Sequence, residues 1–445
     1  MNAIDLTLTP LRSGLLTGHD TTCLVLVSAR APAAPAAPNR TRPPLNLALV
    51  IDRSGSMSGQ PLAEAKRCAE YVVNGLAPTD RASVIAYCDR VDVVASSQAV
   101  KDRGKLLRAI RSIRERGATA LYDGWRIAAD QALFGHSPEG LSRVLLLSDG
   151  NANRGPASAE EIEPKVGAVA AQGVSTSTYG LGHRFNEHLM MAMARAGQGN
   201  AYYGESAEDL MDPFREELDL LNALCARNLA LTLESPSGIQ IHLLNDYAQR
   251  TDGRWRLPDL AFGGEAWALT ELRIPRDIAS ERGKREIEIL RATLAYEEID
   301  GGPRLSDPAR LTLPLLPASA YEAIAENEIV RARAQELRAA DIQEQARTAA
   351  RLRQWERVDE LLETARLESA GNPWLVQSVE VLAGYARCRN TERFSKEAYF
   401  KSRRLRSRLV RSDEGASQYD SVTEAGVPLF LRRKAEQGKK AGPER

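Results

Sequence analysis

The spacing of hydrophobic and polar residues changes character several times along this chain. Residues 4–29 alternate apolar and polar side chains around a Gly-containing break, a pattern that predicts two β-strands within residues 1–30. The next stretch, RAPAAPAAPNRTRPP, contains prolines too closely spaced for a helix or a central strand. We therefore predict an extended linker over residues 31–44.

Between residues 45 and 224, short apolar runs alternate with amphipathic segments. This order is typical of a mostly parallel sheet covered by helices on both faces, the first helix beginning near Pro61. The predicted strands are 45–51, 82–88, 91–96, 143–148, 174–179 and 200–204. Because only Asp89 and Arg90 separate the second strand from the third, we predict a hairpin there and an antiparallel edge strand.

Alternation with a period of two returns over residues 225–318, for example in REIEILRATLAYEE, and predicts a β-sandwich. Residues 1–30 share that character, so we predict that they join the same sandwich and that the α/β domain is inserted into it. The arrangement is feasible because the two ends of an inserted domain usually lie close together.

Residues 319–410 are rich in Ala, Glu, Arg and Leu, which predicts a C-terminal α-helical region. Within it, RLRQWERVDELLETARLESAGNPW resembles one helix-turn-helix repeat, with Gly371 closing a helix and Pro373 opening the next. Residues 411–445 are rich in Gly, Ser and charge and are predicted to be a mostly disordered tail, apart from the apolar island VPLFL. The predicted fold class is thus α/β, a doubly wound sheet inserted in a β-sandwich and followed by helices.

Composition narrows the function. Acidic and basic residues balance at 59 each, so no overall charge draws the chain to nucleic acid or to an anionic membrane. The chain has no uncharged apolar run approaching about 18 residues, and its first residues lack the apolar core of a signal peptide. The five cysteines have no C-x-x-C spacing, which argues against a disulfide framework or a zinc ribbon. The simplest location is the cytoplasm.

Three short motifs bring oxygen-bearing side chains to one region. DRSGS, with Asp52, Ser54 and Ser56, follows the first predicted strand, and LLLSDG places Asp149 after another. Parallel strands end at the same edge of a sheet, where ligands of such sheets bind. Between these motifs, GATAL places Thr119 on a loop that leads into a helix.

Two carboxylates and three hydroxyls are hard donors that suit Mg²⁺, which takes about six oxygens and keeps several waters. In D-x-S-x-S, alternate residues of a turn can direct their side chains at one point, and Gly55 is expected to permit the sharp backbone. The alternative for this motif alone is a helix N-cap, in which Ser and Asp bind free amides and no metal.

These motifs resemble the metal-ion-dependent adhesion site of von Willebrand factor A domains, over roughly residues 45–224. The resemblance implies that the two serines coordinate the metal directly and that Thr119 joins them in the ligand-competent state. Asp52 and Asp149 would act directly or through water, and a Glu or Asp of a partner protein would complete the coordination. It implies an Mg²⁺-dependent scaffold or adaptor, with Ca²⁺ or Mn²⁺ also possible in the site.

The flanking layout is similar to bacterial relatives of inter-alpha-trypsin-inhibitor heavy chains and of so-called calcium-activated chloride channel proteins. The resemblance suggests a MoxR-type AAA+ ATPase as a partner. It also implies that the helix ending the α/β domain, at about 206–224, shifts when the metal changes coordination.

Two other functions remain open. A metal-dependent hydrolase or phosphatase could use Asp52 as nucleophile, although the chain has no G-x-S-x-G or G-x-x-x-x-G-K-[ST] motif. A metal-independent scaffold could act through the basic run FKSRRLRSRLVR, whose partner-binding candidates are Arg403, Arg404, Arg406 and Arg408. That run could instead form a solvated helix face with its apolar residues packed inward.

Overall fold

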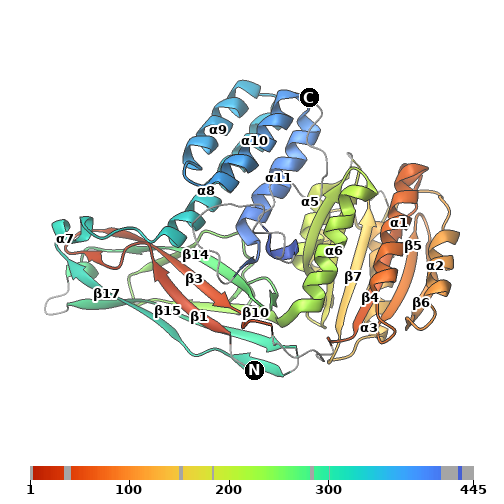
Figure 1. Cartoon of the computed structure of the whole chain (residues 1–445), viewed down its shortest axis with the longest axis horizontal. Coiled ribbons are helices and arrows are strands. Elements are labelled where there is room, and N and C mark those ends of the chain that lie inside the picture. The colour runs from red at the N-terminus through yellow and green to blue at the C-terminus, as the bar shows by residue number, and fades with distance from the viewer. Residues whose placement is uncertain are drawn as a thin grey trace. The chain divides into compact units, whose positions relative to one another are not determined.

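The computed structural model describes residues 4–34, 42–149, 154–182, 185–280, 285–299, 301–411 and 429–432 (Figure 1). The chain folds into two compact units. The α/β unit is built from residues 39–222, and the sandwich unit from residues 1–38 together with residues 223–427. Part of the predicted linker and nearly all of the predicted tail fall outside the described residues.

A six-stranded sheet forms the centre of the α/β unit, in the order β6-β5-β4-β7-β8-β9. The strands are β4 (Leu45–Asp52), β5 (Arg81–Tyr87), β6 (Val91–Ala99), β7 (Leu141–Ser148), β8 (Val174–Leu181) and β9 (Gln198–Gly204). All neighbours are parallel except β5 and β6, which form the predicted hairpin. Every residue of β4 and β7 is buried, as expected of central strands covered on both faces.

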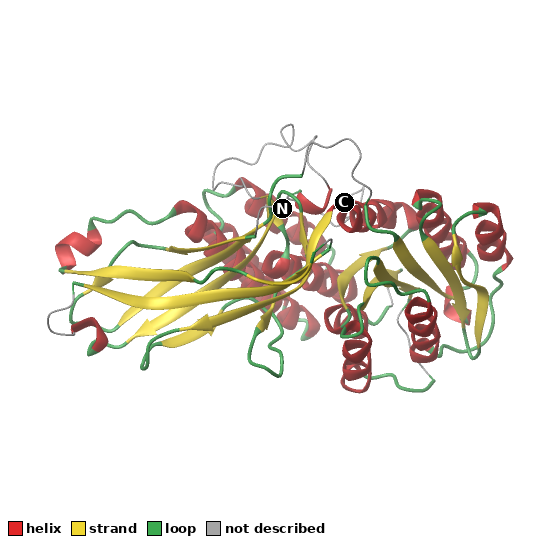
Figure 2. Cartoon of the chain, turned by 90° about the horizontal axis from the view of Figure 1, so that it is seen from below, coloured by secondary structure: helices red, strands yellow, loops and turns green. Residues whose placement is uncertain are grey.

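Helices cover both faces of this sheet (Figure 2). They are α1 (Gln60–Gly75), α2 (Arg103–Ser112), α3 (Leu121–Phe134), α4 (Ala159–Ala170), α5 (Glu187–Ala196) and α6 (Ala207–Ala223). Successive residues of β8 point to opposite faces. Thr176 accepts a hydrogen bond from Trp125 of α3, whereas Ser177 donates to Glu217 of α6. Helices α3 and α6 therefore lie on opposite faces, and α1 packs beside α6, where Gly75 meets Leu218.

Two sheets, antiparallel except where β2 pairs with β17, make the β-sandwich of the other unit. The first contains β1 (Asp5–Pro10), β3 (Thr21–Arg30), β14 (Gly264–Ile274), β11 (Gln240–Leu243) and β18 (Val410–Arg411). The second contains β12 (Trp255–Arg256), β10 (Leu224–Glu234), β15 (Glu286–Glu298), β17 (Ala309–Leu316), β2 (Leu15–Leu16), β13 (Leu260–Ala261) and β16 (Gly302–Leu305). Strand β3 pairs with β14 along its whole length, so the α/β unit interrupts the sandwich in sequence. The first 30 residues contain one strand more than predicted, because the short β2 pairs in parallel with β17.

The C-terminal helices are α7 (Ala318–Glu322), α8 (Glu328–Arg351), α9 (Trp355–Glu368), α10 (Pro373–Arg387) and α11 (Thr391–Ser407). Helix α8 packs on β3 and β14 through a cluster that includes Trp267 and Leu337. Gly371 has φ +84° between α9 and α10, a conformation that favours glycine, and Pro373 opens α10. Short 3₁₀ turns lie at η1 (Gly55–Met57), η2 (Ile278–Ser280) and η3 (Leu429–Leu431). The predicted fold class is confirmed.

Candidate functional site

The parallel strands bring the predicted site residues to the carboxyl edge of the α/β sheet. Asp52 is the last residue of β4, and Asp149 directly follows β7, its immediate neighbour in the sheet. Both side chains are buried. The apolar runs that precede them place these strands in the centre of the sheet. Asp52 therefore lies beside the polar residues that follow the second run, Ser148 and then Asp149.

The DRSGS segment forms a compact turn around the Asp52 carboxylate. Asp52 Oδ1 accepts a hydrogen bond of 2.9 Å from the backbone N–H of Ser54. The hydroxyls of Ser54 and Ser56 lie 3.1 Å apart, the first buried and the second exposed. Met57, fully buried, anchors the 3₁₀ turn in the core. The turn thus presents two adjacent hydroxyls beside a carboxylate, with Ser56 open to solvent.

The prediction that Gly55 permits a sharp backbone in this turn is wrong. The residue of this loop with positive φ is Gly59, at +76°, whereas Gly55 begins the 3₁₀ turn. Its backbone N–H donates to the carbonyl of Gly117, 3.0 Å away. A β-carbon at position 55 would meet that carbonyl oxygen at 3.6 Å, an ordinary contact. Gly55 therefore connects two loops and does not supply a left-handed backbone.

Two residues that the sequence reading missed hold the second oxygen of Asp52. Ser148 donates to Asp52 Oδ2 at 2.7 Å, and the Tyr87 hydroxyl lies 3.0 Å from the same oxygen and 2.8 Å from Ser148 Oγ. All three side chains are fully buried. Both oxygens of Asp52 therefore bind groups of this chain, which fixes the carboxylate in place. The polar Ser148, directly after the apolar run Val144–Leu147, was the signal available in the sequence.

The loop that carries Thr119 is held against the DRSGS turn by its backbone. Arg116 donates to the carbonyl of Arg53 at 2.8 Å, and Gly117 accepts from Gly55. Thr119 itself is buried, and its carbonyl accepts a 3.2 Å hydrogen bond from the N–H of Arg154, on the loop after β7. The three loops that carry the predicted residues are thus joined to one another by backbone hydrogen bonds.

The electrostatics of the site suit a cation. Burial and then the negative charge of Asp149 raise the pKa of Asp52, more than the hydrogen bonds from Ser54 and Ser148 lower it. A divalent cation between the two carboxylates would offset this repulsion. Three hydroxyls and two carboxylates are also the oxygen donors that such a hard cation prefers. The donor set therefore fits a metal, even though the described residues contain no cluster of three or more His, Cys, Asp and Glu suited to metal binding.

The basic run near the C-terminus makes contacts within its own unit. Arg403 pairs with Asp246, and Arg406 pairs with Asp341. Arg408 is buried and binds Glu336 at 3.0 Å. Helix α11 ends at Ser407, so the last residues of the run belong to β18 and not to a helix. Arg404 is half-buried.

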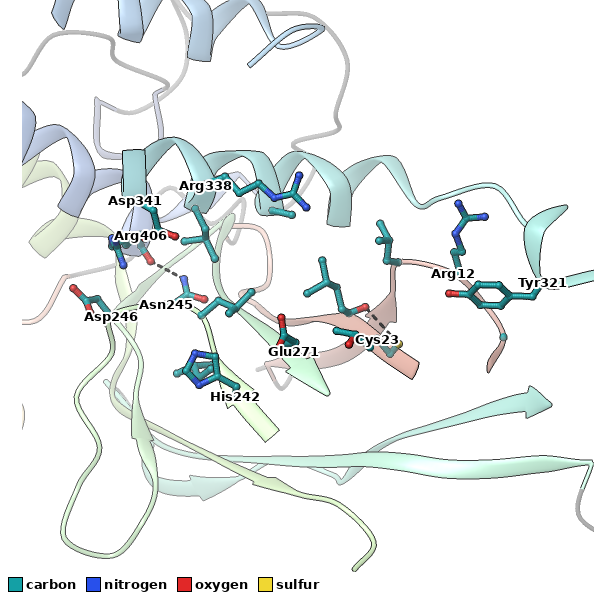
Figure 3. A pocket seen from close by; sticks show the side chains of 18 residues that line it. Arg12, Cys23, His242, Asn245, Asp246, Glu271, Tyr321, Arg338, Asp341 and Arg406 are labelled. Atoms are coloured by element: carbon teal, nitrogen blue, oxygen red, sulfur yellow. Dashed lines mark hydrogen bonds and ion pairs between the residues drawn. The ribbon is translucent and has the colours of Figure 1, made fainter. Parts of the chain in front are cut away.

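A cavity of about 620 Å³ lies in the sandwich unit, between the sheet of β3, β11 and β14 and helix α8 (Figure 3). Its middle is apolar, and its charged residues have partners: Arg12 pairs with Glu326 and Arg406 with Asp341. Burial raises the pKa of the Cys23 thiol to about 12, which makes this cysteine a poor nucleophile. We therefore place the candidate site at the edge of the α/β sheet.

Comparisons with known proteins agree with this architecture. The sequence profile of the von Willebrand factor type A domain matches residues 46–216. An uncharacterized protein of Synechocystis sp. is 31% identical over 218 residues, which are 49% of this chain and 51% of that protein. Human inter-alpha-trypsin inhibitor heavy chain H3 is 28% identical over 186 residues, which are 39% of this chain and 21% of that protein. The chain thus spans about half or less of the length of these relatives.

A solved structure of a von Willebrand factor type A protein from Catenulispora acidiphila has the same fold, with a TM-score of 0.65. It is 16% identical, and the match covers 85% of this chain and 90% of that one. The chain therefore contains a doubly wound α/β fold of this kind. More specifically, it contains a von Willebrand factor type A domain.

Such domains mediate protein–protein interactions and often bind a divalent cation, and their homologues are mostly non-enzymatic scaffolds or adhesion proteins. Across the described ranges, no helix combines the length and the apolar character needed to cross a bilayer.

Proposed function

We propose that this chain is a scaffold or adaptor that captures an acidic residue of a partner protein through a divalent cation, Mg²⁺ in the first instance. The observation that carries the proposal is the DRSGS turn. There both oxygens of the buried Asp52 accept hydrogen bonds, one of them from the backbone of the turn, and the hydroxyls of Ser54 and Ser56 lie 3.1 Å apart at the edge of the sheet.

The residues of the site would have different roles in binding the cation. Ser54, Ser56 and Thr119 offer hydroxyl oxygens, and Asp149 offers a carboxylate next to them. Asp52 suits a role in orienting the turn and bound water, because both of its oxygens already accept hydrogen bonds. When bound, the cation supplies a positive charge with an open coordination position, which favours an incoming carboxylate.

The hydrolase alternative fits the structure less well. A nucleophilic aspartate must reach the substrate with a free oxygen. Asp52 is fully buried, its Oδ1 binds the Ser54 amide, and its Oδ2 binds Ser148. These contacts support a positioning role.

The basic-helix alternative also has less support. Three of its four arginines already bind carboxylates of the same unit, Arg403 to Asp246, Arg406 to Asp341 and Arg408 to Glu336. Capturing a partner through them would require these ion pairs to exchange. Such an interaction would persist in chelator and weaken in high salt.

We further propose that α6 couples the metal site to the rest of the chain, because it runs directly into β10, the first strand after the insert. Glu217 ties this helix to three strands, binding Arg143 of β7, Ser177 of β8 at 2.7 Å and Asn200 of β9 at 2.8 Å. A shift of α6 would have to break or rearrange these contacts. The free energy of the shift therefore includes the cost of losing them.

Affinity purification of the full chain in Mg²⁺ and in EDTA, followed by mass spectrometry, tests the function. Partners, among which we would look for a MoxR-type AAA+ ATPase, should be lost in EDTA and with Ser54→Ala. Ser58→Ala is the matched control, because Ser58 is an exposed serine of the same loop that binds Glu115. Equal capture by wild type and Ser54→Ala, in Mg²⁺ and in EDTA, would refute the proposal. Loss of the same partners in high salt alone would favour the basic helix.

A further inference from the structure

Arginines gather on the loops around the candidate metal site. Arg116 and Arg154 are exposed, and their backbone amides bind the DRSGS turn and the Thr119 loop, at the carbonyls of Arg53 and Thr119. Arg90 is exposed on the β5–β6 turn, whose Cys88 carbonyl accepts from Ala120, next to Thr119, at 2.7 Å. Three separate loops therefore each carry an exposed arginine. Each of these loops is joined by a backbone hydrogen bond to a loop that holds predicted metal ligands.

The structure shows these arginines without ion-pair partners among the described residues. Within the described ranges, no ion pair engages Arg90, Arg116 or Arg154. A neighbouring carboxylate, Asp89, is exposed; the hydrogen bond from Cys88 lowers its pKa, and the charges of Arg90 and Arg154 add to that effect. Arg53 points instead to β6, where it pairs with Asp92.

The local charge balance is positive. Residues 88–90, residues 113–120 and residue 154 together carry four arginines and two carboxylates, namely Arg90, Arg114, Arg116, Arg154, Asp89 and Glu115. Glu115 already accepts from Ser58. A divalent cation bound beside Asp52 and Asp149 would neutralise the charge of these two aspartates, which would then no longer offset the surrounding arginines. The surface next to the open coordination position is therefore suited to additional negative charge.

We propose that the partner segment captured by this domain is polyacidic. One of its carboxylates binds the metal, and at least one more, a few residues away, binds Arg116 or Arg154. This inference rests on the proposed function and adds the sequence character of the partner. Guanidinium groups bind carboxylates through paired N–H donors, so exposed arginines beside a metal-bound acid select for a second acid.

The test uses the full chain and two fluorescent peptides of equal length in saturating Mn²⁺. One has a single central Glu among Ser and Gly, and the other has the same Glu flanked by Asp and Glu. We expect the wild type to bind the polyacidic peptide at least fivefold tighter, with the difference shrinking as NaCl is raised. The variant Arg116→Gln/Arg154→Gln should lose this preference while binding Mn²⁺ as the wild type does.

The matched control is Lys101→Gln/Lys105→Gln, which removes two exposed positive charges after the far end of β6 and should keep the preference. If Mn²⁺ and the single-Glu peptide bind but the polyacidic peptide has no advantage, or keeps it in the arginine variant, the inference fails and the proposed function stands. If binding of both peptides is unchanged in EDTA or by Ser54→Ala, the proposed function fails and the inference fails with it.

Discussion

Glu217→Gln tests a deeply buried ion pair of the α/β unit, the one between Glu217 and Arg143. The Glu217 carboxylate is fully buried on α6, pairs with the buried Arg143 and accepts from Ser177, Asn200 and Tyr202. Removing one partner of such a pair costs about 3–5 kcal/mol, because the other charge stays buried without compensation. Glutamine keeps one oxygen acceptor, so we expect a cost of about 3 kcal/mol.

Hydrogen exchange of the full chain, resolved for peptides from α6 and β8, is the suitable assay, because a chain with two units need not unfold in one step. The double variant Arg143→Met/Glu217→Gln removes both charges and should recover part of the loss, with a coupling energy of about 2 kcal/mol. A cost below about 1 kcal/mol for Glu217→Gln, with no coupling to Arg143, would refute the reasoning.

The stability that Glu217 contributes depends on pH in a defined direction. Burial alone raises the pKa of Glu217, but the charge of Arg143 and the hydrogen bonds from Ser177 and Asn200 outweigh it and hold the pKa below its ordinary value. Stability from this group is therefore present above the unfolded pKa of about 4.3 and is lost as pH falls through the lower folded pKa. The difference in stability between wild type and Glu217→Gln should stay constant from about pH 7 to 5 and shrink only in acid. A difference that already shrinks between about pH 7 and 5 would contradict this assignment.

Three further predictions concern the site and its coupling. Tyr87→Phe removes one hydrogen bond from the Asp52–Ser148 network and should weaken Mn²⁺ binding by roughly 0.5–1.5 kcal/mol, measured by calorimetry; unchanged affinity would argue against the positioning role. Gly117→Ala should destabilise the loop before α3 by at least about 1 kcal/mol in hydrogen exchange, because Gly117 has φ +61° and a β-carbon would lie 2.5 Å from Asp89 Oδ1. A disulfide joining α1 to α6 near the contact of Gly75 with Leu218 should alter partner affinity, measured with and without reductant; equal affinities would count against coupling through α6.

The sequence was sufficient where the determinants are local. A buried apolar run ending in DRSGS, and another ending in LLLSDG, predicted two central strands and the edge at which Asp52 and Asp149 lie. The partners of Asp52 could not be predicted in the same way. Tyr87 and Ser148 are 35 and 96 residues away from it in sequence, and they meet it only because β5, β4 and β7 are adjacent.

The basic run shows the same limit. Its sequence carries no acid, which suggested an exposed charged surface. Arg406 and Arg408 nevertheless pair with Asp341 and Glu336 of α8, which α11 packs against. Ion pairs between helices that are distant in sequence depend on tertiary packing. The local sequence pattern therefore cannot predict them.

Anomalous diffraction from crystals of the full chain grown with Mn²⁺ tests the central claim most directly. We predict a manganese peak bounded by the hydroxyls of Ser54 and Ser56 and by the side chains of Thr119 and Asp149, and its loss with Ser54→Ala. Saturating Mn²⁺ that gives no peak at this edge of the sheet, or a peak that persists in Ser54→Ala, would contradict the account.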